Sequence, residues 1–187
     1  MKNRKVHFQF QPFSKKQRMV LNWWCSSSPV RDMDGIIADG AIRSGKTIAM
    51  SLSFVMWAMD NFDGQNFGLC GKTIGSFRRN VLFWLKAMCG SRGYDVEDKR
   101  ADNLLEISRK GVTNYFYIFG GKDERSQDLI QGITLAGVFF DEVALMPQSF
   151  VNQATGRCSV SGSSSVCGVW RKASSTTCFP RKNMLSR

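Results

Sequence analysis

The segment from Gly40 to Thr47 matches the pattern G-x-x-x-x-G-K-[ST] in full. Glycines in such a loop let the backbone wrap around a phosphate chain with its N–H groups pointing inward. Lys46 would then reach the β- and γ-phosphates of a nucleotide, and the Thr47 hydroxyl would bind Mg²⁺. The helix expected after the loop offers its positive N-terminal end to the same phosphates. The residues predicted to bind the nucleotide here are Gly40, Ala41, Ile42, Arg43, Ser44, Gly45, Lys46 and Thr47.

The alternative interpretation of this segment is a glycine-rich turn between a strand and a helix, with an incidental lysine. The bare pattern arises by chance in roughly one chain of this length in a hundred. Here an apolar run precedes the pattern and a helical run follows it. That context favours a phosphate-binding loop.

A second motif predicts a carboxylate at the end of a strand, because the apolar run 138–140 leads into Asp141 and Glu142. Ligands of open α/β sheets bind at the carboxyl ends of the strands. Asp141 would hold Mg²⁺ through water, and Glu142 would polarise the water that attacks the γ-phosphate. By itself the motif fits an acidic turn after a strand equally well. Together with the phosphate loop it predicts an ATPase-type site.

Two further residues keep two interpretations each. Arg43, inside the loop, would either swing onto the γ-phosphate as an arginine finger supplied in cis or contact bound phosphates as a solvated base. Gln17 completes the pattern Ser14-x-x-Gln17, a capping box that starts a helix. Its alternative role is to read the adenine edge with its amide, as Asn and Gln do in nucleic-acid recognition. The residues alone favour the cap.

Strands alternate with helices along most of the chain. This order predicts an α/β fold with a mainly parallel central sheet flanked by helices. After about Ser161 the sequence is rich in Ser, Cys and Arg without sustained periodicity, so we expect a poorly structured C-terminal tail. The expected strands are 6–10, 34–39, 66–70, 103–107, 113–119 and 135–140, and the expected helices are 14–24, 47–59, 76–88 and 123–130.

The formal net charge of +11 arises from 26 Lys and Arg against 15 Asp and Glu. The first 18 residues carry six bases and no acid, and the last 45 do the same, whereas residues 19–142 hold 14 bases and 15 acids. The excess favours a polyanionic partner, nucleic acid before membrane. It lies at the two ends of a nearly neutral middle, however, so it says little about the middle itself.

Other classes of protein are disfavoured by single observations. His7 is the only histidine, which argues against a Ser-His-Asp triad. The six cysteines lack zinc-type spacing, and without an export signal we expect reduced thiols in a cytosol. The longest uncharged stretch of the middle, 47–59, is too short for a membrane-spanning helix.

Four stretches together resemble the N-terminal ATPase part of the large terminase subunit of tailed bacteriophages, of the PBSX type. The likeness covers about residues 5–160, and an arginine within the phosphate loop is distinctive for that family. The resemblance implies a RecA-type P-loop NTPase of the additional-strand class. It also implies a motor in the host-cell cytoplasm that uses ATP hydrolysis to push double-stranded DNA into a preformed capsid. The four stretches are 13–17, 40–47, 120–128 and 132–142.

The resemblance assigns roles to the residues that match its motifs. Gln17 becomes an adenine contact, and Arg43 becomes a γ-phosphate sensor or finger arginine. Lys46 and Thr47 take the phosphates, and Glu142 becomes the catalytic carboxylate, with Arg43 and Lys46 also counted as catalytic.

The implied cofactors are ATP and Mg²⁺, with Thr47 and Asp141 as the residues that hold the metal. The implied partners are double-stranded DNA, the portal protein, the small terminase subunit and further copies of the chain in a homo-oligomer, without a membrane. Lys122 and Arg125 lie in a matching stretch, but neither the residues nor the resemblance assigns them a role.

The sequence departs from the family after about residue 160. Family members continue into a coupling motif and a nuclease domain, and a metal-dependent nuclease needs clustered carboxylates. No Asp or Glu follows Glu142, so we expect no nuclease site of the family's kind and a truncated or out-of-frame tail. The expected organisation is an N-terminal arm and adenine-side helix over 1–34, an incomplete ATPase domain over 35–160, and the tail over 161–187. Two other functions stay open, a non-catalytic nucleotide- or DNA-binding remnant and a helicase-like P-loop ATPase.

Overall fold

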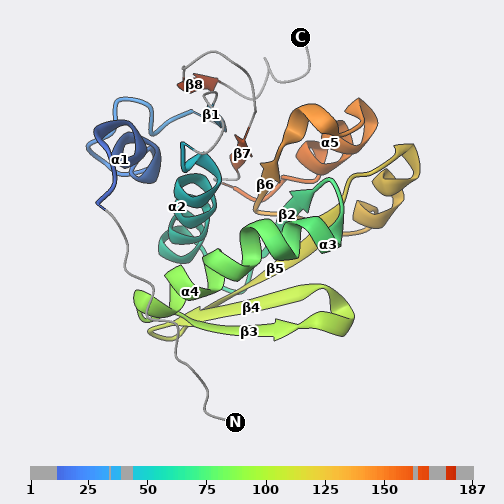
Figure 1. The fold of residues 1–187 in the computed structure, drawn as a ribbon, viewed down its shortest axis with the longest axis horizontal. Coiled ribbons are helices and arrows are strands. Elements are labelled where there is room, and N and C mark those ends of the chain that lie inside the picture. The colour runs from blue at the N-terminus through green and yellow to red at the C-terminus, as the bar shows by residue number, and fades with distance from the viewer. Residues whose placement is uncertain (1–11, 34, 39–43, 162–163, 169–175, 180–187) are drawn as a thin grey trace.

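The computed structural model describes residues 12–33, 35–38, 44–161, 164–168 and 176–179. Within these ranges an eight-stranded sheet has the order β3-β4-β5-β2-β6-β7-β1-β8 and carries helices on both faces (Figure 1). The described strands are β1 (Gly35–Ala38), β2 (Asn66–Gly71), β3 (Asp95–Lys99), β4 (Leu104–Arg109), β5 (Val112–Gly120), β6 (Gly137–Asp141), β7 (Ser164–Gly168) and β8 (Thr176–Phe179). The described helical segments are α1 (Lys15–Leu21), α2 (Lys46–Asn61), α3 (Ile74–Phe77), η1 (Arg78–Leu82), α4 (Phe83–Ser91), η2 (Arg100–Asp102), η3 (Glu124–Ile130), η4 (Val143–Leu145) and α5 (Gln148–Gly156).

The five central strands, β5, β2, β6, β7 and β1, run parallel to one another. At one edge β8 pairs antiparallel with β1, and at the other edge β4 and β3 extend the sheet antiparallel from β5. The predicted α/β class with a mainly parallel sheet is therefore confirmed. Because these strands are parallel, the carboxyl ends of β1, β2, β5 and β6 lie at the same edge of the sheet.

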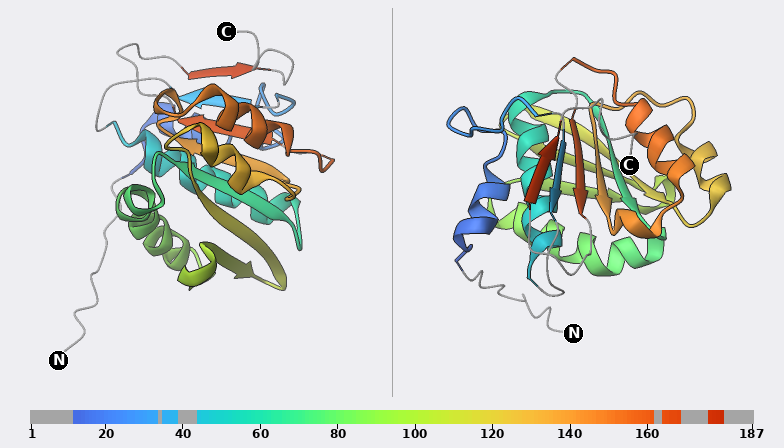
Figure 2. Two further views of the ribbon diagram at one scale, coloured as in Figure 1. Left: turned by 90° about the vertical axis from the view of Figure 1, so that its right-hand side faces the viewer. Right: turned by 90° about the horizontal axis from the view of Figure 1, so that it is seen from above.

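Alternate residues of the central strands pack on opposite faces of the sheet. Phe139 of β6 belongs to the same hydrophobic cluster as α2, whereas Val138 and Phe140 belong to the cluster that contains residues of η3 and α5. Figure 2 shows α2 on one side of the sheet and α5 on the other. Burial on both faces explains why β6 is a continuous apolar run instead of an alternating one.

The helix that the sequence predicts over 47–59 is α2, which is buried on nearly all sides. Its Phe54 ring contacts the rings of Phe67, Phe116 and Phe139, which come from β2, β5 and β6. This aromatic packing holds α2 against the middle of the sheet. Among the helices that the structure describes, none is long and apolar enough to cross a bilayer.

α1 begins as the capping box predicts, since the Ser14 hydroxyl accepts a hydrogen bond from the Gln17 N–H. It ends at Leu21, before the tryptophan pair that the sequence analysis includes in the helix. The buried hydroxyl of Ser53 on α2 donates to the Val20 and Leu21 carbonyls at 2.8 and 3.0 Å. The last carbonyls of a helix have no intrahelical partner. Ser53 therefore completes the end of α1 and joins it to α2.

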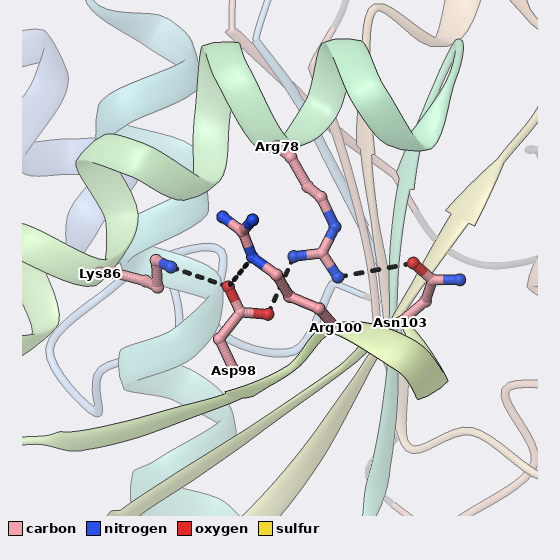
Figure 3. A network of polar contacts seen from close by, with 5 residues as sticks. All are labelled: Arg78, Lys86, Asp98, Arg100 and Asn103. Atoms are coloured by element: carbon pink, nitrogen blue, oxygen red, sulfur yellow. Dashed lines mark hydrogen bonds and ion pairs between the residues drawn. The ribbon is translucent and has the colours of Figure 1, made fainter.

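The helix predicted over 76–88 consists of three segments, because the π-helical η1 interrupts it between α3 and α4. Figure 3 shows Arg78 of η1 reaching Asp98 of β3, with Lys86 and Arg100 around the same carboxylate. Arg78 Nη1 and Lys86 Nζ each lie 2.8 Å from an Asp98 carboxylate oxygen, and Arg100 Nε lies 3.7 Å away. Burial raises the pKa of Asp98, but the hydrogen bonds from Arg78 and Lys86 outweigh burial and bring that pKa below its ordinary value. The network ties this helical run to the β3–β4 hairpin.

β3 is a strand that the sequence analysis does not predict. Its sequence, Asp-Val-Glu-Asp-Lys, carries four charged residues in five. It is the edge strand and pairs with β4 alone. Edge strands are often charged, because charge discourages pairing with another chain.

Two described strands lie in the tail for which the sequence predicts poor structure. β7 inserts between β6 and β1, and β8 pairs with the other side of β1. At these two short segments the structure differs from the prediction. Their serines and threonines carry no apolar pattern, and the pairing instead satisfies backbone groups of β6 and β1. The strand predicted over 6–10 lies outside the described residues.

Ser53→Ala should lower the free energy of unfolding by about 1–3 kcal/mol, because it leaves two buried carbonyls without a donor. Chemical denaturation followed by circular dichroism measures the change. Ser51→Ala is the matched control, since the Ser51 hydroxyl donates only within α2, to the Ile48 carbonyl. Equal losses in the two variants would contradict the role of Ser53 at the α1–α2 junction.

Candidate functional site

The phosphate loop and the Asp141–Glu142 pair meet at the carboxyl edge of the sheet. Thr47, in the first turn of α2, donates from Oγ1 to Oδ1 of Asp141 at 3.0 Å. The two residues are 94 positions apart in the sequence, and the parallel order of β1, β7 and β6 brings them together. The structure thus joins the two motifs that the sequence analysis singled out.

Asp141 occupies an environment that disfavours its ionised form. The pKa of this carboxyl is raised to about 6: burial is the main cause, the hydrogen bond from Thr47 lowers the pKa, and the charge of Glu142 raises it. A carboxylate held in this way is stabilised by a nearby cation.

Glu142 leaves the strand abruptly after Asp141. Its backbone is left-handed, with φ 59° and ψ 47°, and it caps the short η4 segment. For a residue other than glycine this conformation costs of order 1 kcal/mol. The turn separates the two acidic residues, so that Asp141 belongs to β6 and Glu142 to the connection that follows it.

The described end of the phosphate loop passes directly into α2. Gly45 is the N-cap of the helix, and its backbone is left-handed, with φ 75°. A side chain at this position would disfavour that backbone conformation. Lys46 Nζ lies 3.1 Å from the Ser44 hydroxyl oxygen. The N–H groups of the first turn of α2 therefore face the loop in the arrangement that suits a bound anion. The remaining predicted loop residues, Gly40, Ala41, Ile42 and Arg43, lie outside the described residues.

Gln17 contacts the loop as well as capping α1. Its Oε1 accepts from the Ser14 N–H at 2.9 Å, and its Nε2 donates to the Ser44 carbonyl, also at 2.9 Å. The predicted capping box is confirmed. The adenine contact stays a prediction.

A cavity of about 890 Å³ opens between α1, the 22–33 segment, β1 and the start of α2. Gln17, Ser44 and Lys46 lie on its wall. Much of the remaining lining is apolar, with residues such as Val30, Ile36 and Met50. These lining residues are not predicted from the sequence, because apolar residues from four separate segments carry no pattern that marks them as one wall.

Lys122 and Arg125 are exposed near the same edge of the sheet. The N–H of Gly121, beside Lys122, donates to the Gly71 carbonyl at the end of β2 at 2.8 Å. Arg125 lies on η3, where the sequence predicts a short helix. The structure brings neither side chain to Thr47 or Asp141 through a hydrogen bond or ion pair among the described residues.

Residues 37–166, more than half of the chain, match the family described as terminase large subunit, T4likevirus-type, N-terminal. The chain belongs to this family. The match contains the whole phosphate loop and the Asp141–Glu142 pair. The finer assignment to the PBSX type stays a prediction. No curated protein matches the chain.

Solved terminase structures resemble the chain closely. The large terminase from a thermophilic bacteriophage is 70% identical with a TM-score of 0.82, and the match covers 85% of this chain and 39% of that one. The same phage protein has also been solved in complex with ADP, where the identity is 68%, the TM-score is 0.81, and the match covers 84% of this chain and 39% of that one. In its complex with ATP-gamma-S the identity is 65%, the TM-score is 0.79, and the match covers 84% of this chain and 38% of that one. This terminase chain therefore spans less than half the length of that relative.

A more distant terminase shares the fold. The ATPase domain of the Thermus phage P74-26 large terminase is 18% identical with a TM-score of 0.59, and the match covers 86% of this chain and 65% of that one. At this identity the likeness supports the fold alone.

Asp141 should titrate near pH 6 in the ligand-free terminase chain, and carboxyl-carbon NMR measures this directly. Its folded pKa lies above the ordinary 3.8, so the contribution of this group to stability is present below about pH 4 and is lost as the pH rises to about 6. Asp141→Asn should remove that part of the pH dependence. Thr47→Val removes the hydrogen bond that lowers the pKa, so the pKa should rise further. A measured value near 4 would contradict the burial argument.

Proposed function

We propose that the chain is the ATP-binding and ATP-hydrolysing motor part of a phage large terminase. The observation that carries this proposal is the Thr47–Asp141 hydrogen bond, because it sets the described end of a phosphate loop against a partly buried carboxylate at the start of α2. The complexes of the thermophilic bacteriophage terminase with ADP and ATP-gamma-S support a nucleotide at this site.

The residues at this edge fit a hard divalent cation such as Mg²⁺. The Thr47 hydroxyl and the Asp141 carboxylate supply oxygen ligands, which Mg²⁺ prefers. The raised pKa of Asp141 reflects a buried negative charge that a cation would stabilise. Thr47 would hold the ion directly and Asp141 through water. When bound, the ion neutralises charge on the phosphates of the nucleotide.

The proposed chemistry divides among a few side chains. Lys46 donates to the β- and γ-phosphates, assisted by the N–H groups at the start of α2. Glu142 accepts a hydrogen bond from the attacking water and orients it toward the γ-phosphorus. Arg43 acts at the γ-phosphate, a role that rests on its place within the loop and on the resemblance. Gln17 contributes an adenine contact from the cavity wall.

Lys46→Ala should abolish ATP binding, because it removes the ammonium group that is proposed to donate to the β- and γ-phosphates. Isothermal titration calorimetry with ATP and Mg²⁺ measures the affinity. Lys110→Asn is the control: it also removes one positive charge, at a left-handed hairpin position that Asn tolerates. Equal affinity in Lys46→Ala and the parent chain would contradict the assignment of the site.

The proposed partners follow from the terminase family. They are double-stranded DNA, the portal protein, the small terminase subunit and further copies of the chain, and the proposed setting is the cytoplasm of the host cell. This part of the proposal rests on the family. The charge of the chain adds little support for a DNA partner, because residues 19–142 have nearly balanced charge.

Phosphate release should be measurable with the parent chain, should rise with double-stranded DNA, and should fall at least about a hundredfold in Glu142→Gln. A steady-state phosphate assay with and without DNA tests all three points, and calorimetry should give Glu142→Gln the ATP affinity of the parent. Phosphate release that is equally low in the parent chain and in Glu142→Gln would favour a non-catalytic remnant. ATP-dependent strand unwinding would favour a helicase-like ATPase.

A further inference from the structure

Gln17 joins two parts of the chain that lie 27 positions apart. Its Oε1 and its backbone N–H form the reciprocal cap with Ser14, at 2.9 and 3.3 Å. Its Nε2 donates to the Ser44 carbonyl at 2.9 Å. One side chain therefore fixes the start of α1 and the end of the phosphate loop at the same time.

The contact with the loop is close enough to constrain its backbone. A Cβ atom added at Gly45 would lie 2.7 Å from Gln17 Nε2, so the amide packs directly over this glycine. Ser44 in turn accepts from Lys46 Nζ through its hydroxyl. Segment 44–47 is thus held at one end by Gln17 and at the other by the Thr47–Asp141 hydrogen bond.

Gln17 acts from a fixed support. The other end of α1 is anchored by the buried Ser53 hydroxyl, which donates to the Val20 and Leu21 carbonyls. α2 begins at the loop and also carries Ser53. The two ends of α1 are therefore both tied to the same unit, one to segment 44–45 through Gln17 and the other to α2 through Ser53.

The amide of Gln17 has hydrogen-bonding capacity left over. A carboxamide offers two N–H donors and two acceptor lone pairs, and the structure uses one of each on Ser44 and Ser14. A base in the neighbouring cavity can engage the remaining donor and acceptor while the contact with Ser44 stays in place.

We infer that Gln17 is a positioning residue for the phosphate loop, holding Ser44 and Gly45 for phosphate binding whatever base is present. This inference rests on the proposed nucleotide site. It separates Gln17 from a residue that only contacts the base, because a ligand without a base should also be sensitive to it.

Inorganic tripolyphosphate with Mg²⁺ is the probe, since it offers phosphates and no base. In calorimetry, Gln17→Met should weaken tripolyphosphate binding by about three- to tenfold, the loss expected for one hydrogen bond, and should weaken ATP binding at least as much. Ser14→Ala is the matched control, because it removes the hydroxyl half of the cap and leaves both side-chain hydrogen bonds of Gln17 available. It should bind tripolyphosphate like the parent chain.

Gln17→Glu covers the case in which Gln17→Met does not fold. Ser-x-x-Glu is an equally good capping box, but a carboxylate cannot donate to the Ser44 carbonyl. High ionic strength weakens the effect of the added charge, and the loss of tripolyphosphate affinity should persist there.

Unchanged tripolyphosphate affinity together with weakened ATP affinity in the Gln17 variants would overturn the inference and leave the proposed function intact. Equal weakening in Ser14→Ala would assign the effect to helix capping and would also overturn it. Lys46→Ala should lose tripolyphosphate and ATP alike. If Lys46→Ala binds both ligands like the parent, the proposed function itself fails.

Discussion

Burial of the Asp141 carboxylate is the constraint on which the arrangement of the site depends. A shift from 3.8 to about 6 in its pKa corresponds to roughly 3 kcal/mol that favours the neutral form. This net value already includes the hydrogen bond from Thr47, which offsets part of the cost of burial. This hydrogen bond also orients the first turn of α2 toward the end of β6. The same bond that eases the burial of the carboxylate therefore sets the phosphate loop opposite it.

Such an arrangement requires a rigid platform, and the packing of the sheet supplies it. β6 buries Phe139 on one face and Val138 and Phe140 on the other, so the strand has little freedom to shift at its carboxyl end. α2 is held by Phe54 against three strands. Segment 44–47, at the start of α2, is then held from both sides, by Asp141 and by Gln17.

The parts of the fold that the sequence predicts are those in which one local rule decides the outcome. α2 and β6 each contain an apolar run long enough to be predicted from the sequence, and the spacing of the glycines marks the loop before Lys46. β3 escapes recognition because its stability comes from pairing with β4 and from the cations around Asp98, which lie elsewhere in the sequence. β7 escapes because backbone pairing with two neighbours determines it.

The two interpretations of Gln17 show a different limit. The pattern Ser14-x-x-Gln17 predicts a cap, and the resemblance predicts an adenine contact. They compete only if the amide has a single role. The structure gives that amide two partners on separate atoms, so the cap does not exclude a further contact. No spacing rule contains this information, because Ser44 reaches Gln17 only after α1 has packed against α2.

The charges at the site also explain why a cation belongs in the proposed chemistry. A nucleotide brings several negative charges to an edge that already carries Asp141 and Glu142. Against these stand Lys46, Arg43 in its proposed role at the γ-phosphate, and the start of α2, which contributes about half a positive charge. Residues 19–142 supply no net positive field to make up the difference. Attraction of the nucleotide must therefore be local, and a divalent ion that enters with the phosphates balances both the ligand and the partly buried carboxylate.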